Sequence, residues 1–239
     1  MFDRTLFLSP NLTSPVPAWE YHLHSNHSDG SATMTALVET ALAKGIARLI
    51  FTEHTEPDLV GKGDWFRRYA DEFYTVRDKF DQQIELILGL EAPALDMEGT
   101  LLLTPEMEQE AQFILAAVHA YPGLGWNFRE LSPTTAIEIE HKTLLGLFKN
   151  PRIDAIAHPG GVCSSYVAPF PMDLFEEIAA LAHEKQVAIE LNPAYQSPLL
   201  PYWQACHRQQ TLISPGSNAH HPHQIGRAWQ DLQTLILSQ

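Results

Sequence analysis

Apolar and polar positions alternate along this chain in a way that predicts short strands separated by amphipathic helices. Runs such as IELILGL at 84–90 are apolar, short and bounded by polar residues, which is typical of buried strands. Between these runs, apolar residues recur every three or four positions, as in a helix with one buried face. The predicted strands are residues 19–23, 48–52, 84–90, 113–118, 153–157, 187–191 and 211–214. The predicted helices are residues 33–45, 64–81, 132–148, 171–185, 200–209 and 221–237.

This alternation of strands and helices indicates a parallel sheet built from βαβ units. About seven such units fit the chain. The pattern favours a barrel related to the eight-stranded one, and an open doubly wound sheet is the alternative. The Pro- and Ser-rich start of the chain predicts an N-terminal arm at residues 1–18, followed by a single domain at residues 19–239.

The charge of the chain narrows the partners that we expect. Lys and Arg total 15 and Asp and Glu total 29, which gives a net charge of −14. Such a surface repels long nucleic acids and anionic membranes, whereas a small anionic substrate can still enter a locally positive pocket. The two cysteines, Cys163 and Cys206, predict no disulfide framework. No stretch resembles a signal peptide or a membrane span, so we expect a cytoplasmic protein.

Histidines and acids stand where the predicted strands end. In a parallel barrel these ends share one face, so residues far apart in sequence converge there. The pair His22 and His24 closes the first strand, and its two-residue spacing directs both rings to one side. The other strand ends carry His54, Glu91, His119, His158, Asn218 and His220.

These residue types predict a metal centre. Neutral imidazole suits zinc, iron, nickel and copper, and carboxylates extend the range to manganese and magnesium. So many histidines and acids exceed the needs of one tetrahedral ion, which indicates two or three divalent transition metals. A carboxylate can bridge two ions through its two oxygens, so Glu91 is the expected bridging and catalytic residue.

The motifs HLHSNHSDG, TEH, GLE, VHA, AHPG and SNAH resemble, in order, those of the PHP family, named for polymerase and histidinol phosphatase. The resemblance implies a distorted seven-stranded β/α barrel that hydrolyses phosphoesters with zinc, manganese or iron. It places one metal on His22, His24, Glu91 and Asn218, a second on Glu91, His119 and His158, and a third on Asp29, His54 and His220. Asn218 stands where the family has Asp, so we expect weaker binding of the first metal.

The segments DWFRRYADEF and ELNPAYQSP look closest to the stand-alone histidinol-phosphatase branch. We therefore expect a small phosphomonoester as substrate, attacked by a hydroxide that bridges two metals. His27 is a candidate proton donor, and the candidate substrate-binding residues are Arg67, Arg68, Arg129 and Tyr195. Two alternatives are a phosphodiesterase acting on nucleotides or short oligonucleotides, and a metal-binding PHP domain with impaired catalysis.

Overall fold

The computed structural model describes residues 7–60 and 63–238, apart from the side chain of Arg129, and in this part of the chain seven strands form one sheet. The strands are β1 (Trp19–Leu23), β2 (Arg48–His54), β3 (Glu85–Pro93), β4 (Phe113–Ala117), β5 (Ala155–Ile156), β6 (Ala188–Leu191) and β7 (Ile213–Pro215). Their order in the sheet is their order in the chain. A doubly wound sheet reverses its strand order at a switch point, and this one does not. The predicted fold class, an α/β protein of the seven-stranded β/α type, is therefore confirmed.

Helices separate the strands, as predicted. They are α1 (Met34–Ala43), α2 (Pro57–Val60), α3 (Trp65–Phe80), α4 (Pro105–Glu110), α5 (Pro133–Leu147), α6 (Gly161–Tyr166), α7 (Met172–Lys185), α8 (Leu200–Gln209) and α9 (Arg227–Leu237), with short 3₁₀ turns η2 (Asn127–Glu130) and η3 (Pro222–Gln224). Local sequence sets several starts. The side chains of Thr33 and Ser132 accept hydrogen bonds from the first turns of α1 and α5, and Pro133 opens α5. No helix in the described part of the chain has the length and apolar character that crossing a membrane requires.

The chain divides into two compact units. The β1–β2 unit comprises Thr13–Glu91, Leu103–Ile114 and the residues from Pro215 onward. The β5–β6 unit comprises the residues up to Leu12, Ala92–Leu102 and Leu115–Ser214.

In the β1–β2 unit, a fully buried strand lies between two parallel neighbours. Every residue of β2 is buried, and β2 pairs in parallel with both β1 and β3. The register sets His54 opposite Glu91, so two predicted ligands stand side by side at the strand ends. Helix α3 packs against α1, and the hydroxyl of Tyr69 donates to the carbonyl of Gly89 at 2.7 Å. That bond satisfies the polar tip of a fully buried ring.

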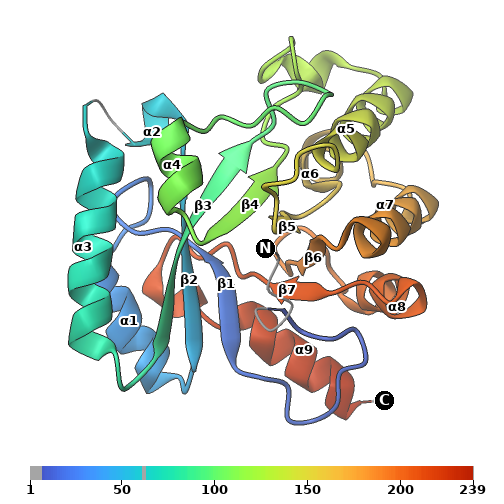
Figure 1. Cartoon of the computed structure of the whole chain (residues 1–239). Helices are drawn as coiled ribbons and strands as arrows, with labels where there is room; N and C mark the ends of the chain where they lie inside the picture. The colour runs from blue at the N-terminus through green and yellow to red at the C-terminus, as the bar shows by residue number, and fades with distance from the viewer. Residues whose placement is uncertain (1–6, 61–62, 239) are drawn as a thin grey trace. The chain divides into compact units, whose positions relative to one another are not determined.

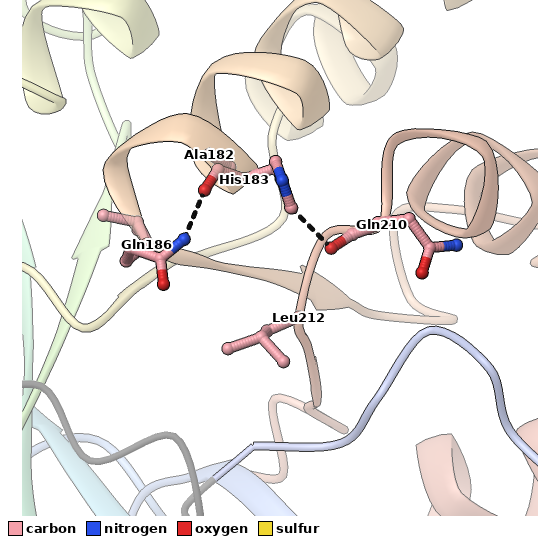
Figure 2. A pocket seen from close by; sticks show the side chains of 6 residues that line it. Ala182, His183, Gln186, Gln210 and Leu212 are labelled. Atoms are coloured by element: carbon pink, nitrogen blue, oxygen red, sulfur yellow. Dashed lines mark hydrogen bonds between the residues drawn. The ribbon is translucent and has the colours of Figure 1, made fainter.

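In the β5–β6 unit, β5 pairs in parallel with β4 and β6, and α7 packs against α8 (Figure 1). Figure 2 shows a small pocket where α7 and α8 end, lined by Ala182, His183, Gln186, Val187, Gln210 and Leu212. A ring nitrogen of His183 lies 2.8 Å from the carbonyl oxygen of Gln210 and ties the two helix ends together. None of these six lining residues belongs to the predicted site.

Two predicted elements differ clearly in the structure. The helix expected at residues 221–237 is divided into η3 and α9, so the α-helix begins only at Arg227. Gly226 takes a left-handed conformation, with φ of +80°, which interrupts the helix. The predicted strand at 153–157 is also shorter, with only Ala155–Ile156 paired as β5.

Candidate metal centre

The end of β1 and the end of β3 bring two imidazoles and a carboxylate together in the β1–β2 unit. The Nε2 atoms of His22 and His24 are 3.1 Å apart, and both rings are fully buried. An Oε2 atom of Glu91 lies 3.2 Å from Nε2 of His22 and 3.6 Å from Nε2 of His24. The two-residue spacing of the histidines along β1 places both rings on the same face, as the sequence predicted.

A second group surrounds Asp29 in the same unit. Its carboxylate Oδ1 lies 3.2 Å from Nε2 of His220 and 3.6 Å from Nε2 of His54. The ring of His24 stacks on that of His54, with centroids 4.2 Å apart. Ligand atoms of these four residues all lie within 4.8 Å of one another. They come from the end of β1, the loop after it, the end of β2 and the loop after β7.

His24 belongs to both groups, but a neutral imidazole offers one lone pair to one ion. If His24 joins His22 and Glu91, then Asp29, His54 and His220 remain as a second set of three. The β1–β2 unit alone can thus hold two ions, each with three protein ligands.

The protonation states of His24 and Asp29 agree with metal binding. Burial, together with the neighbouring rings of His54 and His22, lowers the pKa of His24 well below its ordinary value. The ring is therefore neutral and able to coordinate at physiological pH. Burial raises the pKa of Asp29, but hydrogen bonding and charge from His220 and His54 outweigh it, so the net shift is downward. For His220, burial lowers the pKa, and the bonds to Asp29 and to the carbonyl of Asn218 outweigh that effect.

Asn218 lies within this cluster. Its Oδ1 atom is 3.1 Å from Nε2 of His24, which places the amide where the resemblance implies a carboxylate ligand. Its backbone has a φ of +48°, a left-handed conformation that Asn and Asp tolerate better than most residues. The backbone therefore accommodates either side chain, and the amide changes the charge of the site rather than its shape.

Two buried carboxylates that sequence reasoning missed hold the ligand-bearing loops. Glu53 on β2 accepts from the backbone N–H of Ser25 at 2.8 Å and from the hydroxyl of Ser28 at 2.5 Å, which fixes the loop before Asp29. Glu20 on β1 accepts from the N–H groups of Ser217 and Gly226, both at 2.8 Å. Burial raises the pKa of both carboxyls, although these hydrogen bonds oppose it. The only signal in the sequence was position: Glu20 lies inside the first predicted strand, and Glu53 stands between the second predicted strand and His54.

His119 and His158 belong to the β5–β6 unit and lie close to each other there. Their rings stack with centroids 5.9 Å apart. The backbone N–H of His158 donates to the buried carboxylate of Glu190 at 2.6 Å, and its φ of +27° is unusual for a residue with a side chain. The ring of Tyr195 lies 4.5 Å from that of His158. The assignment of a second metal to Glu91, His119 and His158 stays a prediction.

The remaining predicted residues have other neighbours. A ring nitrogen of His27 lies 2.8 Å from a carboxylate oxygen of Glu72, a residue of α3. Arg67 forms ion pairs with Glu106 and, at 3.5 Å, with Glu110, so carboxylates of α4 already neutralise it. Arg68 is exposed on α3, and the side chain of Arg129 lies outside the described residues. Roles for these residues in substrate binding stay predictions.

Imidazoles and carboxylates gathered at the ends of parallel strands define a metal-binding α/β protein. The chain belongs to the PHP-domain family, whose pattern matches residues 20–194. It is 27% identical to a probable phosphatase of Acetivibrio thermocellus over 219 residues, covering 86% of this chain and 80% of that protein. A probable phosphatase of Thermoanaerobacter sp. strain X514 is 24% identical over 223 residues, covering 90% and 83% respectively.

A solved structure has the same fold. The histidinol phosphate phosphatase of Lactococcus lactis, crystallised with zinc, L-histidinol and phosphate, superposes with a TM-score of 0.69. The match covers 93% of each chain at 19% sequence identity. At that identity the likeness establishes the fold, and the substrate must be argued from this chain's own residues.

Proposed function

We propose that this chain hydrolyses a small phosphomonoester with two or three divalent transition metal ions, zinc, manganese or iron. The chain is a hydrolase of phosphoric ester bonds, consistent with its PHP family and with relatives named as phosphatases. The observation that carries the proposal is the convergence of the imidazole and carboxylate side chains in the β1–β2 unit. They can be divided into two sets of three ligands, one around Glu91 and one around Asp29.

Each set suits a first-row divalent ion. His22, His24 and Glu91 combine two imidazoles with one carboxylate, and so do His54, His220 and Asp29. Three protein ligands leave coordination positions open, as catalytic sites require and structural zinc sites do not. When bound, such ions lower the pKa of water toward neutrality and neutralise charge on a phosphoryl group.

The charge of the ligand set favours a monoester. Only two of the ligands, Glu91 and Asp29, carry negative charge, and Asn218 contributes an uncharged amide where the resemblance implies a third carboxylate. Two or three divalent ions therefore leave the site clearly positive. A dianionic phosphomonoester gains more from such a site than a monoanionic diester or a neutral amide does.

The protein's own groups then have separate tasks. The strand ends hold the imidazoles at fixed positions, so little reorganisation is needed when substrate binds. Burial keeps His24 neutral and keeps water away from its ring. We further propose that His27, whose orientation is held by Glu72, is available to transfer a proton to the leaving group. Histidinol phosphate is our first candidate substrate, because the sequence looks closest to that branch of the family.

The test is a phosphatase assay with purified protein reconstituted with Zn²⁺, Mn²⁺ or Fe²⁺. Substrates would be an aryl phosphate, histidinol phosphate, other phosphorylated metabolites and a bis-aryl phosphodiester. We expect phosphate release from monoesters, loss of activity with chelator, and about 10²-fold or greater loss in His22→Ala. The exposed His207→Ala provides the matched control and should retain activity.

Three outcomes would contradict the proposal. Activity that survives exhaustive chelation would exclude metal-dependent hydrolysis. A clear preference for the diester would favour the phosphodiesterase alternative. Metal binding without hydrolysis of any ester would favour a domain with impaired catalysis, and Asn218 would be the first residue to restore to Asp.

A further inference from the structure

The loop that carries Asn218 and His220 is held from two sides by polar side chains outside the metal cluster, those of Glu20 and Lys44. We call residues 217–226 the C-terminal ligand loop. On one side, the fully buried Glu20 accepts hydrogen bonds from the N–H groups of Ser217 and Gly226 and from the hydroxyl of Ser217. These contacts fix the first and last residues of the loop to β1.

On the other side, Lys44 binds the middle of the same loop. Lys44 follows α1 as its C-cap, and its Nζ donates to the carbonyls of His223 at 2.8 Å and Ile225 at 2.7 Å. The carbonyl of Pro222 lies at 3.5 Å from the same atom. An ammonium group has three donors, so this one side chain can engage all three carbonyls. Hydrogen bonds from a charged donor are among the stronger ones in proteins.

The turn that Lys44 holds is connected directly to the backbone of His220. The side-chain oxygen of Gln224, within this turn, accepts from the N–H groups of His220 at 2.9 Å and His221 at 2.8 Å. The carbonyl of His220 accepts from the N–H of Ser31 at 2.8 Å. His220 is therefore fixed at both its N–H and its carbonyl, and the N–H side depends on the turn at residues 222–225.

We propose that Lys44 is a positioning residue for the metal site: with Glu20 it fixes the C-terminal ligand loop and so sets where His220 meets Asp29 and His54. The inference rests on the proposed function only in requiring that this cluster binds metal. Lys44 contacts none of the predicted ligands through its side chain in any described hydrogen bond; it acts through the carbonyls of residues 222–225. Groups that hydrogen-bond directly to metal ligands commonly change metal affinity 10–100-fold, and Lys44 acts one step further out.

The test measures Zn²⁺ affinity by competition with a chromophoric chelator, without substrate. Lys44→Met keeps the length of the side chain and removes its donors, and we expect about tenfold weaker binding at one of the sites. Lys79→Met is the matched control, since Lys79 is exposed and pairs only loosely with Glu39, at 3.8 Å. It should bind Zn²⁺ as the parent does. Lys44→Arg, which keeps charge and donors, should recover part of the loss.

A second background separates positioning from general destabilisation. In His220→Ala the ligand that Lys44 positions is absent, so adding Lys44→Met should change the remaining Zn²⁺ affinity less than twofold. The inference would be overturned if Lys44→Met weakened Zn²⁺ binding equally in the parent and in His220→Ala. It would also be overturned if Lys44→Met did not weaken Zn²⁺ binding in the parent. If Lys44→Met does not fold by circular dichroism, the same comparison is made with Lys44→Arg, whose smaller loss should likewise vanish in His220→Ala.

The outcomes distinguish this inference from the proposed function. If the parent chain binds Zn²⁺ but hydrolyses no phosphoester, the proposed function is overturned. The role of Lys44 would then still be decided by the Zn²⁺ affinities of the parent and the Lys44 variants. A parent chain that binds no Zn²⁺ would overturn both.

Discussion

At position 218 an amide faces His24, where the resemblance to the PHP family implies a carboxylate. Its Oδ1 atom lies 3.1 Å from Nε2 of His24, and its backbone is left-handed, so the position is close enough to the cluster to act on its charge. An amide oxygen can coordinate a hard or borderline ion, but it adds no charge to offset that of the metal. The difference between Asn and Asp at this position is therefore a test of electrostatics at nearly constant geometry.

We expect Asn218→Asp to bind Zn²⁺ at least about tenfold more tightly, a gain of about 1.4 kcal/mol. The added negative charge lies against the ligand set, and the backbone conformation suits Asp as well as Asn. The measurement is a Zn²⁺ competition titration. Asn127→Asp, at an exposed residue of η2, adds the same charge elsewhere and should leave the affinity unchanged. Equal affinities for Asn218→Asp and the parent would show that residue 218 is not a ligand.

Gly30 shows how little room the ligand loop after β1 has. A Cβ at this residue would lie 2.0 Å from the carbonyl oxygen of His24 and 2.8 Å from that of Ser25, both backbone atoms. The turn is closed by the N–H of Gly30, which donates to the carbonyl of Ser25 at 2.9 Å. Any larger residue must open the turn and displace Asp29.

We therefore expect Gly30→Ala to lower the free energy of unfolding by at least about 2 kcal/mol and to weaken Zn²⁺ binding. Gly123→Ala is the comparison, because Gly123 has φ of +78° but a Cβ added there would meet nothing within 4 Å. Gly123→Ala should lower the free energy of unfolding by only about 1 kcal/mol and leave the Zn²⁺ affinity unchanged. Urea unfolding and metal titration measure both effects. A Gly30→Ala variant as stable as Gly123→Ala would mean that the turn relaxes without cost.

At the scale of elements, the sequence predicted most strands and helices because their patterns are local. The alternation of His22 and His24, the caps at Thr33 and Ser132, and the buried run of β2 all depend on near neighbours. The gathering of ligands at strand ends followed from the parallel topology alone. The grouping of the ligands came from the resemblance to the PHP family. Asp29 was also identified only by this resemblance, because it lies in a loop and not at the end of a predicted strand.

The features that sequence reasoning missed depend on contacts between distant residues. The break before α9 occurs at Gly226, whose N–H is bound by Glu20, 206 positions earlier in the chain. The roles of Glu20 and Glu53 as loop anchors are of the same kind, since their partners come from other elements. Periodicity cannot show which donors meet a buried acid, although an acid within an apolar strand indicates that some donor must.

Helices α5 and α6 are joined by another buried acid, Glu140. Its carboxylate accepts from the hydroxyl of Tyr121 and from the N–H groups of Val162 and Cys163. Burial raises the pKa of Glu140 to about 7, although all three hydrogen bonds oppose the shift. The folded chain therefore binds a proton here that the unfolded chain releases between about pH 4.5 and pH 7.

The sign of the pH effect follows from this raised pKa. Because the folded state holds the proton more tightly, the free energy of unfolding falls as pH rises from about 4.5 through about 7, by about 3 kcal/mol from this group. In Glu140→Gln that contribution disappears, so the fall in stability between pH 5 and pH 8 should be smaller than in the parent. Urea unfolding at both pH values measures it.

Glu138→Gln, at an exposed residue of the same helix, is the control and should keep the pH dependence of the parent. Other buried acids with raised pKa values, such as Glu20 and Glu53, contribute equally to all three proteins and cancel in the comparison. A pH dependence in Glu140→Gln as steep as in the parent would mean that Glu140 titrates at its ordinary pKa in the folded protein.

For the whole molecule, metal binding should contribute to stability as well as to chemistry. Ions that bind only the folded chain stabilise it by mass action, by about 2.7 kcal/mol for one site at a free concentration one hundred times its dissociation constant. Two independent sites would give about 5 kcal/mol. For a chain of 239 residues this corresponds to a rise in melting temperature of roughly 10–20 °C.

We therefore expect purified protein, from cells grown with zinc, manganese and iron, to contain more than one equivalent of metal per chain. Removing the metal with chelator should lower the melting temperature by the amount given above, measured by calorimetry alongside elemental analysis. The double variant His22→Ala, His220→Ala removes one ligand from each set, so chelator should barely change its melting temperature. The purified parent could contain metal and yet melt at the same temperature with and without chelator. In that case the ions would lie outside these two sets. Metal-free parent protein that melts at the same temperature with and without added Zn²⁺ would mean that the imidazoles gathered at the strand ends hold no ion at all.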